Sequence, residues 1–330
     1  MRRIAVLALL AVLAAACGSG TAATKKGADA PAGKNGNAFT KAIEQSKGFG
    51  STAADGVFPR TVVHAAGKTV IPAAPKRVVV LSSGELDATV SLGVVPIAAT
   101  PVEGSDLVPA YLADKVRGAH IARVGSTASP SLEAISALHP DLILGSNVGV
   151  GDIYKLLSKI APTVLSIRTG YTWKQDFLLA AAALGRTDRA HSILAAYQKK
   201  AAALGKKFGT DKPTISLVRF TGTEIRAYAG YSFPGTIITD IGLRRPGDQG
   251  GDKLWIGVSA EALTQLDAGW IFYGSLGAPG RTRAHDVTAA PLWHKLKGHP
   301  VGVDDSLWYL GIGPTAAQLI LDQLTHDVAP

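Results

Sequence analysis

Histidine, cysteine and carboxylate residues are the first candidates for metal or catalytic chemistry in this sequence. The eight histidines are scattered along 330 residues, and only His294 and His299 lie near one another, on either side of a lysine-containing turn. A protein metal site needs several such ligands converging on one ion. The sequence therefore predicts no metal site formed by the protein itself.

Signatures of catalysis are also lacking. Ser82 and Glu85 would need a distant histidine to complete a hydrolase triad, and the sequence contains no nucleophile elbow, zincin helix or dinucleotide fingerprint in a strand-to-helix setting. The glycine-rich loop 145–151 lacks the Lys-Ser/Thr ending of a phosphate-binding loop. We therefore predict that the protein is not an enzyme, with a hydrolase as the alternative from a different class.

The single cysteine, Cys17, follows a short apolar run. Arg2 and Arg3 precede this run, residues 4–16, which is too short to cross a bilayer that needs roughly 20 apolar residues. A basic start, an apolar core and small residues are typical of an export signal, here residues 1–16. Residues 13–18 resemble the lipobox of bacterial lipoproteins, although Ala14 stands where Leu is usual. This resemblance implies acylation of Cys17.

Residues 17–56 contain mainly Gly, Ala, Ser, Thr, Lys and Asn. Such a segment cannot offset the entropy of ordering it, so we predict a flexible tether between membrane and folded body. Loss of Arg2 and Arg3 with the signal lowers the formal net charge from +9 to +7. The remaining charges are dispersed. We expect an exported protein on the outer face of the cell membrane, with no nucleic-acid partner.

Short β-branched runs alternate with helical segments in the rest of the chain, which predicts parallel sheets with helical crossovers. Residues 173–210 interrupt this alternation with a long helical segment. We predict an α/β fold with two Rossmann-like lobes, residues 57–172 and 211–330, joined by the helical bridge 173–210. The gap between two such lobes is a natural ligand site. The expected strands are 78–81, 94–98, 141–144, 163–167, 214–220, 224–228 and 270–273, and the expected helices include 85–92, 131–138, 152–160, 233–241, 259–266 and 314–325.

Residues 131–141 and 259–269 are similar to one another, since in both a Ser-x-Glu helix leads into a buried strand. Together with the segments 75–81, 91–94, 231–235, 242–246 and 307–311, this pattern resembles bacterial periplasmic-type binding proteins of the iron-siderophore and cobalamin class. The resemblance covers about residues 58–328. It implies two lobes bridged by one long helix, in a monomer that captures a ligand and delivers it to an ABC transporter permease.

The resemblance also implies roles for two glutamates. Glu133 and Glu261 correspond to a pair of docking glutamates, one on each lobe, that contact arginines of the permease. Two charges at a fixed separation set the register between partners. The alternative for each residue is an ordinary first-turn glutamate favoured by the helix dipole.

In the second lobe, Trp255 and Trp308 match aromatic positions that line the cleft of hydroxamate-siderophore binders. Tyr309 follows Trp308, and Tyr231 precedes an expected helix. Arg219 lies on an otherwise apolar strand, where a buried charge needs a partner, so we expect it to donate to ligand oxygens. A siderophore fills the coordination sphere of its iron, so the protein needs no intrinsic cofactor.

In the first lobe, loops at the carboxyl ends of parallel strands are the expected ligand contacts. This rule indicates residues 82–85, with Ser83, and residues 146–149, with Asn147. Hydroxamate binders often carry an arginine and a tyrosine in this lobe, and the sequence shows neither at the equivalent positions. A ferric hydroxamate siderophore, of the ferrioxamine type for example, is the favoured ligand. Haem, with Tyr309 or Tyr231 as an axial ligand, and cobalamin are the alternatives.

Overall fold

The computed structural model describes residues 44–102 and 104–328 of the 330-residue chain. The predicted export signal and Cys17 lie outside the described residues, as does most of the predicted tether. None of the helices within the described ranges has the length and apolar character needed to cross a bilayer.

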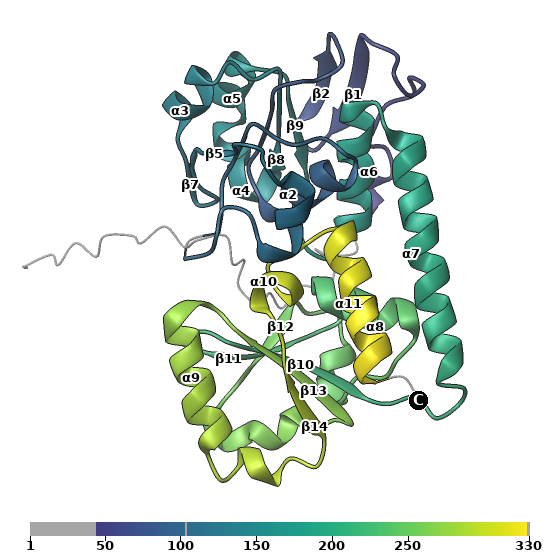
Figure 1. The fold of residues 1–330 in the computed structure, drawn as a ribbon, viewed down its shortest axis with the longest axis vertical. Coiled ribbons are helices and arrows are strands. Elements are labelled where there is room, and N and C mark those ends of the chain that lie inside the picture. Colours follow the sequence, from purple (N-terminus) through teal and green to yellow (C-terminus); the bar gives the residue numbers. More distant parts are fainter. Residues whose placement is uncertain (1–43, 103, 329–330) are drawn as a thin grey trace, which may run out of the picture.

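The N-terminal lobe contains a five-stranded sheet in which every pairing is parallel, in the order β5-β4-β3-β8-β9. All residues of its central strands β3 and β8 are buried, which explains their continuous apolar sequence. A hairpin of β1 and β2 adjoins this lobe beside β9 (Figure 1). The strands are β1 (Arg60–His64), β2 (Gly67–Ile71), β3 (Val78–Val80), β4 (Ala98–Ala99), β5 (Ala122–Arg123), β6 (Gly125–Ser126), β7 (Ser129–Pro130), β8 (Leu142–Ser146) and β9 (Thr163–Ser166); the helices are α2 (Ser83–Ser91), η1 (Ala110–Val116), α3 (Leu132–Ala137), α4 (Asn147–Val150), η2 (Gly151–Ile153) and α5 (Tyr154–Ile160).

The C-terminal lobe contains a mixed sheet in the order β12-β11-β10-β13-β14. The pairs β10–β13 and β13–β14 are parallel, whereas β10–β11 and β11–β12 are antiparallel. The strands are β10 (Ile215–Phe220), β11 (Ile225–Tyr228), β12 (Trp255–Val258), β13 (Trp270–Ser275) and β14 (His299–Gly302); the helices are α8 (Phe233–Ile241), η3 (Gly247–Gly250), η4 (Ala260–Leu266), α9 (Gly277–Ala289), η5 (Trp293–Lys295), α10 (Asp305–Trp308) and α11 (Pro314–Asp327).

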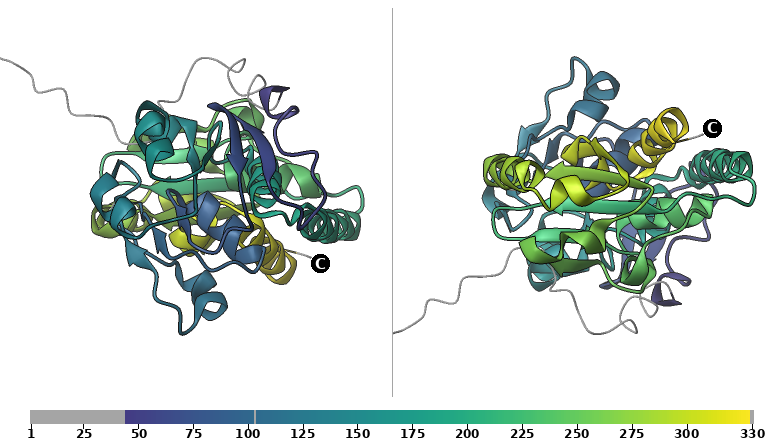
Figure 2. Two further views of the ribbon diagram at one scale, coloured as in Figure 1. Left: turned by 90° about the horizontal axis from the view of Figure 1, so that it is seen from above. Right: turned by 90° about the horizontal axis from the view of Figure 1, so that it is seen from below.

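Two consecutive helices join the lobes, α6 (Trp173–Leu184) and the 21-residue α7 (Thr187–Lys207). Gly185 separates them in a left-handed conformation (φ 68°), which glycine adopts without steric cost. The helix α7 runs along the outside of both lobes (Figures 1 and 2) and buries Tyr197, Ala201 and Leu204 at helical spacing. The predicted α/β fold with two lobes and a long helical bridge is confirmed.

Two expectations about local structure need correction. Residues 50–56, assigned above to a flexible tether, pack onto the folded body, since Gly50 pairs with Val63 and the Asp55 carboxylate accepts hydrogen bonds from the first amides of α7. The segment expected as a helix over 259–266 is a 3-10 helix, η4, with non-helical backbone at Ala262. The strands β12 and β14 and the helix α9 had no counterpart in the expected elements.

Candidate ligand-binding cleft

A cavity of about 450 Å³ lies between the lobes. We call it the main chamber. Loops after β3, β8 and β9 line it from the N-terminal lobe, as expected for the carboxyl ends of parallel strands. The C-terminal lobe contributes residues of β10, β11, β12 and the end of α10. The lining residues used below are Ser82, Ser83, Ser146, Gly149, Arg168, Arg219, Tyr228, Phe233, Trp255, Tyr309 and Ile312.

Arg219, on β10, lies at the wall of the main chamber and is only 3% exposed. Its Nε and Nη2 donate to the two carboxylate oxygens of Asp305 at 2.7 and 2.6 Å, and its Nη1 donates to the Tyr228 hydroxyl at 3.3 Å. Burial by itself would lower the pKa of the guanidinium, but Tyr228 and Asp305 outweigh burial and raise it. Arg219 is therefore charged, with its charge balanced by Asp305.

Three aromatic side chains form the wall around Arg219. Tyr309 packs edge-on against Tyr228, with 4.9 Å between ring centroids, and Tyr228 in turn lies 6.1 Å from Trp255. The guanidinium of Arg226 lies 4.3 Å from the Trp255 ring centroid, which is a cation–π geometry. These contacts hold the rings in place. The wall therefore provides a flat apolar surface, and its side chains lose little conformational entropy when a ligand binds.

Arg168, in the loop after β9, lines the main chamber from the N-terminal lobe. Burial lowers its pKa, and Tyr171 and Asp176 act in the opposite direction. Its guanidinium lies 5.5 Å from the Tyr171 ring centroid. Arg168 was not among the predicted ligand contacts of this lobe. Arg168 follows the expected strand 163–167, so the rule applied to the other two loops would have indicated it.

The structure places some of the predicted ligand contacts at the main chamber and others away from it. Ser83, Arg219, Trp255 and Tyr309 line the main chamber, where their contact with a ligand remains a prediction. Trp308 does not line it. That residue is fully buried, stacks on Phe272 with 4.8 Å between centroids, and donates from Nε1 to Gln323 at 2.8 Å. The assignment of Trp308 as a cleft wall is corrected, because the short helix α10 turns its side chain into the core.

Tyr231 and Asn147 are also outside the residues that line the main chamber. The Tyr231 ring packs on Tyr171, 5.2 Å between centroids. Asn147 is exposed at the start of α4, and the lining in this loop comes from Ser146, Val148 and Gly149 instead.

Two carboxyl groups lie next to the main chamber, Glu85, which is buried, and Asp176, which is half-buried. Glu85 on α2 accepts hydrogen bonds from Ser82 and, at 3.1 Å, from Ser166, while Asp176 on α6 accepts one from Thr172 at 2.9 Å. Burial raises the pKa of Glu85 to about 7. Burial, and then the charge of Glu85, raise the pKa of Asp176 well above its ordinary value. Both groups line a void of about 10 Å³, roughly the space of one water molecule.

The main chamber contains no histidine among its lining residues. The described part of the chain also contains no group of three or more His, Cys, Asp or Glu side chains arranged to hold a metal ion. The Tyr309 hydroxyl donates to the backbone carbonyl of Phe272 at 3.0 Å, so it is engaged in the core.

The two glutamates assigned to docking occupy similar places in the two lobes. Glu133 is exposed in the first turn of α3, and Glu261 is exposed in the first turn of η4. A backbone hydrogen bond and one from Ser259 lower the pKa of Glu261, so this group is ionised at neutral pH. Each lobe therefore presents one carboxylate of this pair at its surface.

Residues 78–298 match the model of the protein family described as periplasmic binding protein. The chain belongs to this family. Its fold and its two-lobed cleft agree with this membership. Family members are substrate-binding proteins, and the prediction that the chain is not an enzyme is confirmed.

Several periplasmic binding proteins are similar over most of their length. The probable siderophore-binding lipoprotein YfiY of Bacillus subtilis is 35% identical over 283 residues, covering 80% of this chain and 86% of that protein. The iron(3+)-hydroxamate-binding protein FhuD of the same organism is 30% identical over 259 residues, covering 74% and 78%. The crystal structure of Staphylococcus aureus SirA with staphyloferrin B superposes with a TM-score of 0.71 at 30% identity, covering 81% of this chain and 97% of that one.

Proposed function

We propose that this chain is the extracellular binding component of an iron uptake system, which captures a ferric siderophore and delivers it to an ABC transporter permease. The main chamber supports this proposal most directly. It combines the guanidinium groups of Arg168 and Arg219 with the aromatic rings of Trp255 and Tyr309. A ferric siderophore offers matching features, namely broad apolar surface and a few outward oxygen atoms that accept from guanidinium donors.

The charge balance of the main chamber favours a hydroxamate-type siderophore. Arg219 forms a bidentate ion pair with Asp305, whose carboxylate balances its charge. The wall around Arg219 thus carries no uncompensated positive charge. A ferric tris-hydroxamate core carries no net charge, whereas a ferric tris-catecholate carries three negative charges that would need uncompensated cations. The names of the relatives include an iron(3+)-hydroxamate-binding protein and an Fe(3+)-citrate-binding protein, so the choice of a hydroxamate rests on the charge of the chamber.

Iron in such a ligand is already surrounded by six oxygen atoms, so no protein ligand is required. Haem, the main alternative, needs an axial histidine or tyrosine. The lining contains no histidine, and Tyr231 is not part of it. The Tyr309 hydroxyl is hydrogen-bonded to the Phe272 carbonyl, and the Tyr228 hydroxyl accepts a hydrogen bond from Arg219. These observations favour the siderophore over haem.

We further propose that Glu133 and Glu261 dock a monomer of this protein onto the permease. Their exposure on separate lobes supports this role, since a permease that contacts both carboxylates would sense the relative position of the lobes.

We also propose that the protein is exported and held at the outer face of the membrane by acyl chains on Cys17. The sequence before Cys17 and the lipoprotein name of a relative support this. Replacing Cys17 with alanine should release the protein from membranes and leave ligand affinity unchanged. Continued detergent-sensitive membrane attachment of the variant would contradict the anchor.

The experiment that tests the ligand is a titration of intrinsic tryptophan fluorescence, followed by native mass spectrometry. Ferrioxamine, ferrichrome, ferric citrate, a ferric tris-catecholate, haem and cobalamin are compared at equal concentration. We expect the hydroxamate complexes to bind most tightly, and their gallium forms to bind equally, because shape and charge are the same. Preferential binding of haem or cobalamin would overturn the proposal.

A further inference from the structure

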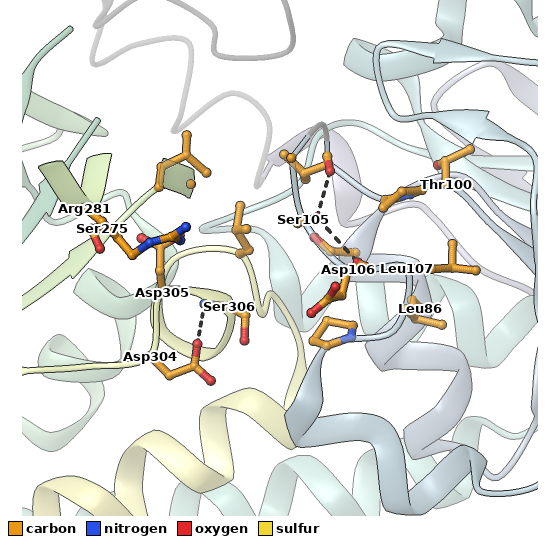
Figure 3. A pocket seen from close by; sticks show the side chains of 18 residues that line it. Leu86, Thr100, Ser105, Asp106, Leu107, Ser275, Arg281, Asp304, Asp305 and Ser306 are labelled. Atoms are coloured by element: carbon orange, nitrogen blue, oxygen red, sulfur yellow. Dashed lines mark hydrogen bonds between the residues drawn. The ribbon is translucent and has the colours of Figure 1, made fainter. Parts of the chain in front are cut away.

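A second cavity, of about 460 Å³, adjoins the main chamber. The two cavities share the lining residues Ser83, Val102, Leu276 and Leu310, so one ligand can extend from one into the other. Figure 3 shows that this cavity lies between Asp304, Asp305 and Ser306 of the C-terminal lobe and Ser105 and Asp106 of the N-terminal lobe. We call it the acidic chamber.

The acidic chamber differs from the main chamber in charge. Its lining includes the carboxylates of Asp106, Asp304 and Asp305. Asp305 is balanced by Arg219, and Arg281 supplies one further positive charge at the lining. Three carboxylates against these two guanidinium groups leave one net negative charge. Asp106 and Asp304 come from opposite lobes and are both exposed.

A neutral side chain in the same lining points independently to a ligand. Thr100 is 2% exposed, and its hydroxyl has no hydrogen-bond partner within the described part of the chain. A buried hydroxyl without a partner is costly, and such groups are uncommon unless something else satisfies them. The Thr100 oxygen can accept a hydrogen bond, which an ammonium group, with three donors and no acceptor, can supply.

We propose that the acidic chamber receives a protonated amine carried on an arm of the ferric siderophore, while the iron-bearing core occupies the main chamber. This inference rests on the proposed function. The amine would lie between Asp304 and Asp106, and the neutral core beside Arg219. The protein would then select siderophores that are cationic at their periphery over neutral ones with the same core.

Two probes with one core test this proposal. Ferrioxamine B ends in a primary amine, and its N-acetylated form has the same ferric hydroxamate core without the positive charge. We expect the wild-type protein to bind the amine form about tenfold more tightly, since each of the two exposed carboxylates contributes a factor of about three. Higher salt should reduce this ratio, because the ion pairs are screened.

The variant Asp304→Asn, alone and with Asp106→Asn, should bring the ratio of the two affinities toward one by weakening the binding of the amine form. Asparagine at 304 still caps α10, where the aspartate now accepts from the Ser306 amide at 2.8 Å, so folding should be retained. Equal binding of both probes by the wild type would overturn the inference, as would a ratio that persists in the double variant. In both cases tight binding of the core would leave the proposed function standing. Failure to bind either probe would overturn the inference, whereas the proposed function would fall only if the other ferric siderophores also failed to bind.

Discussion

The carboxylate of Asp87, on α2, accepts hydrogen bonds from the backbone amides of Thr315 at 2.9 Å and Ala316 at 3.0 Å. These amides belong to the first turn of α11, which packs on α7 and α8 in the core of the C-terminal lobe. A side chain of α2, in the N-terminal lobe, therefore caps a helix of the C-terminal lobe. Asp87 itself is fully buried, and burial raises its pKa against the effect of these hydrogen bonds. The contact joins the two lobes beside the cleft.

Replacement of Asp87 by alanine should lower the free energy of unfolding by about 3 kcal/mol, because the buried Ala316 amide and the partly buried Thr315 amide lose their acceptor. Urea denaturation measures this change. The control is Ser91→Ala, which removes one donor to Asp87 at 2.9 Å and leaves the two amides bonded, so its cost should stay below about 1 kcal/mol. Equal costs for the two variants would contradict the role of Asp87 as a cap.

Glu85 should make stability depend on pH. Burial raises its pKa in the folded state to about 7 from an ordinary value of 4.5, so the folded state binds the proton more tightly than the unfolded state. Its contribution to stability is fully present below pH 4.5 and is lost as pH rises through 7. The loss from this group is at most about 3 kcal/mol.

Glutamine at position 85 resembles the protonated glutamate. We therefore expect Glu85→Gln to match the wild type at pH 5 and to exceed it in unfolding free energy at pH 8.5. Urea denaturation at both pH values, under one ionic strength, measures the difference. An unchanged pH dependence in the variant would show that Glu85 does not titrate in this range.

The two tryptophans first assigned to the cleft should respond oppositely to substitution. Trp255 lines the main chamber, so Trp255→Ala should weaken ferric hydroxamate binding about thirtyfold, the loss typical of one buried aromatic contact. Trp308 lies in the core, so Trp308→Phe should leave affinity unchanged and lower the unfolding free energy by about 2 kcal/mol. Fluorescence titration and urea denaturation of both variants separate the two effects; a binding defect in Trp308→Phe would return that residue to the cleft.

Asp305 should control the charge of ligand that the cleft accepts. The variant Asp305→Asn leaves the Arg219 guanidinium without its balancing charge, which should cost about 3 kcal/mol of stability in the absence of ligand. An anionic ligand would restore the balance. We expect the affinity for a ferric tris-catecholate relative to a neutral ferric hydroxamate to rise about tenfold. The control is Asp286→Asn, on the exposed face of α9. A similar change in relative affinity in this control would show that the effect does not come from the charge beside Arg219.

Docking is tested by the double variant Glu133→Ala, Glu261→Ala. Siderophore uptake by cells should fall to background, because the permease loses both contacts, while binding by the purified protein should be unchanged. A matched control removes two other exposed carboxylates, in Glu44→Ala with Asp286→Ala, and should support normal uptake. Loss of ligand binding in the first variant would place the glutamates in the ligand site instead.

The sequence by itself determined the fold class of this protein, because buried parallel strands and their crossover helices leave a periodic apolar pattern that needs no knowledge of their packing. It also indicated Arg219 as a charge requiring a partner. That partner, Asp305, lies 86 positions along the chain. No local pattern connects the two.

Only the tertiary structure decided which side chains face the cleft. Trp255 and Trp308 are equal candidates in the sequence, yet one begins the edge strand β12 at the chamber and the other is turned into the core by a four-residue helix. Arg168 follows a predicted strand but enters the site only because the N-terminal sheet directs that loop toward the other lobe. The apolar periodicity of a sequence indicates which side chains face the core only where an element is several turns or residues long. At the end of a strand or in a four-residue helix the pattern is too short, so the direction of a side chain is set by packing against distant parts of the chain.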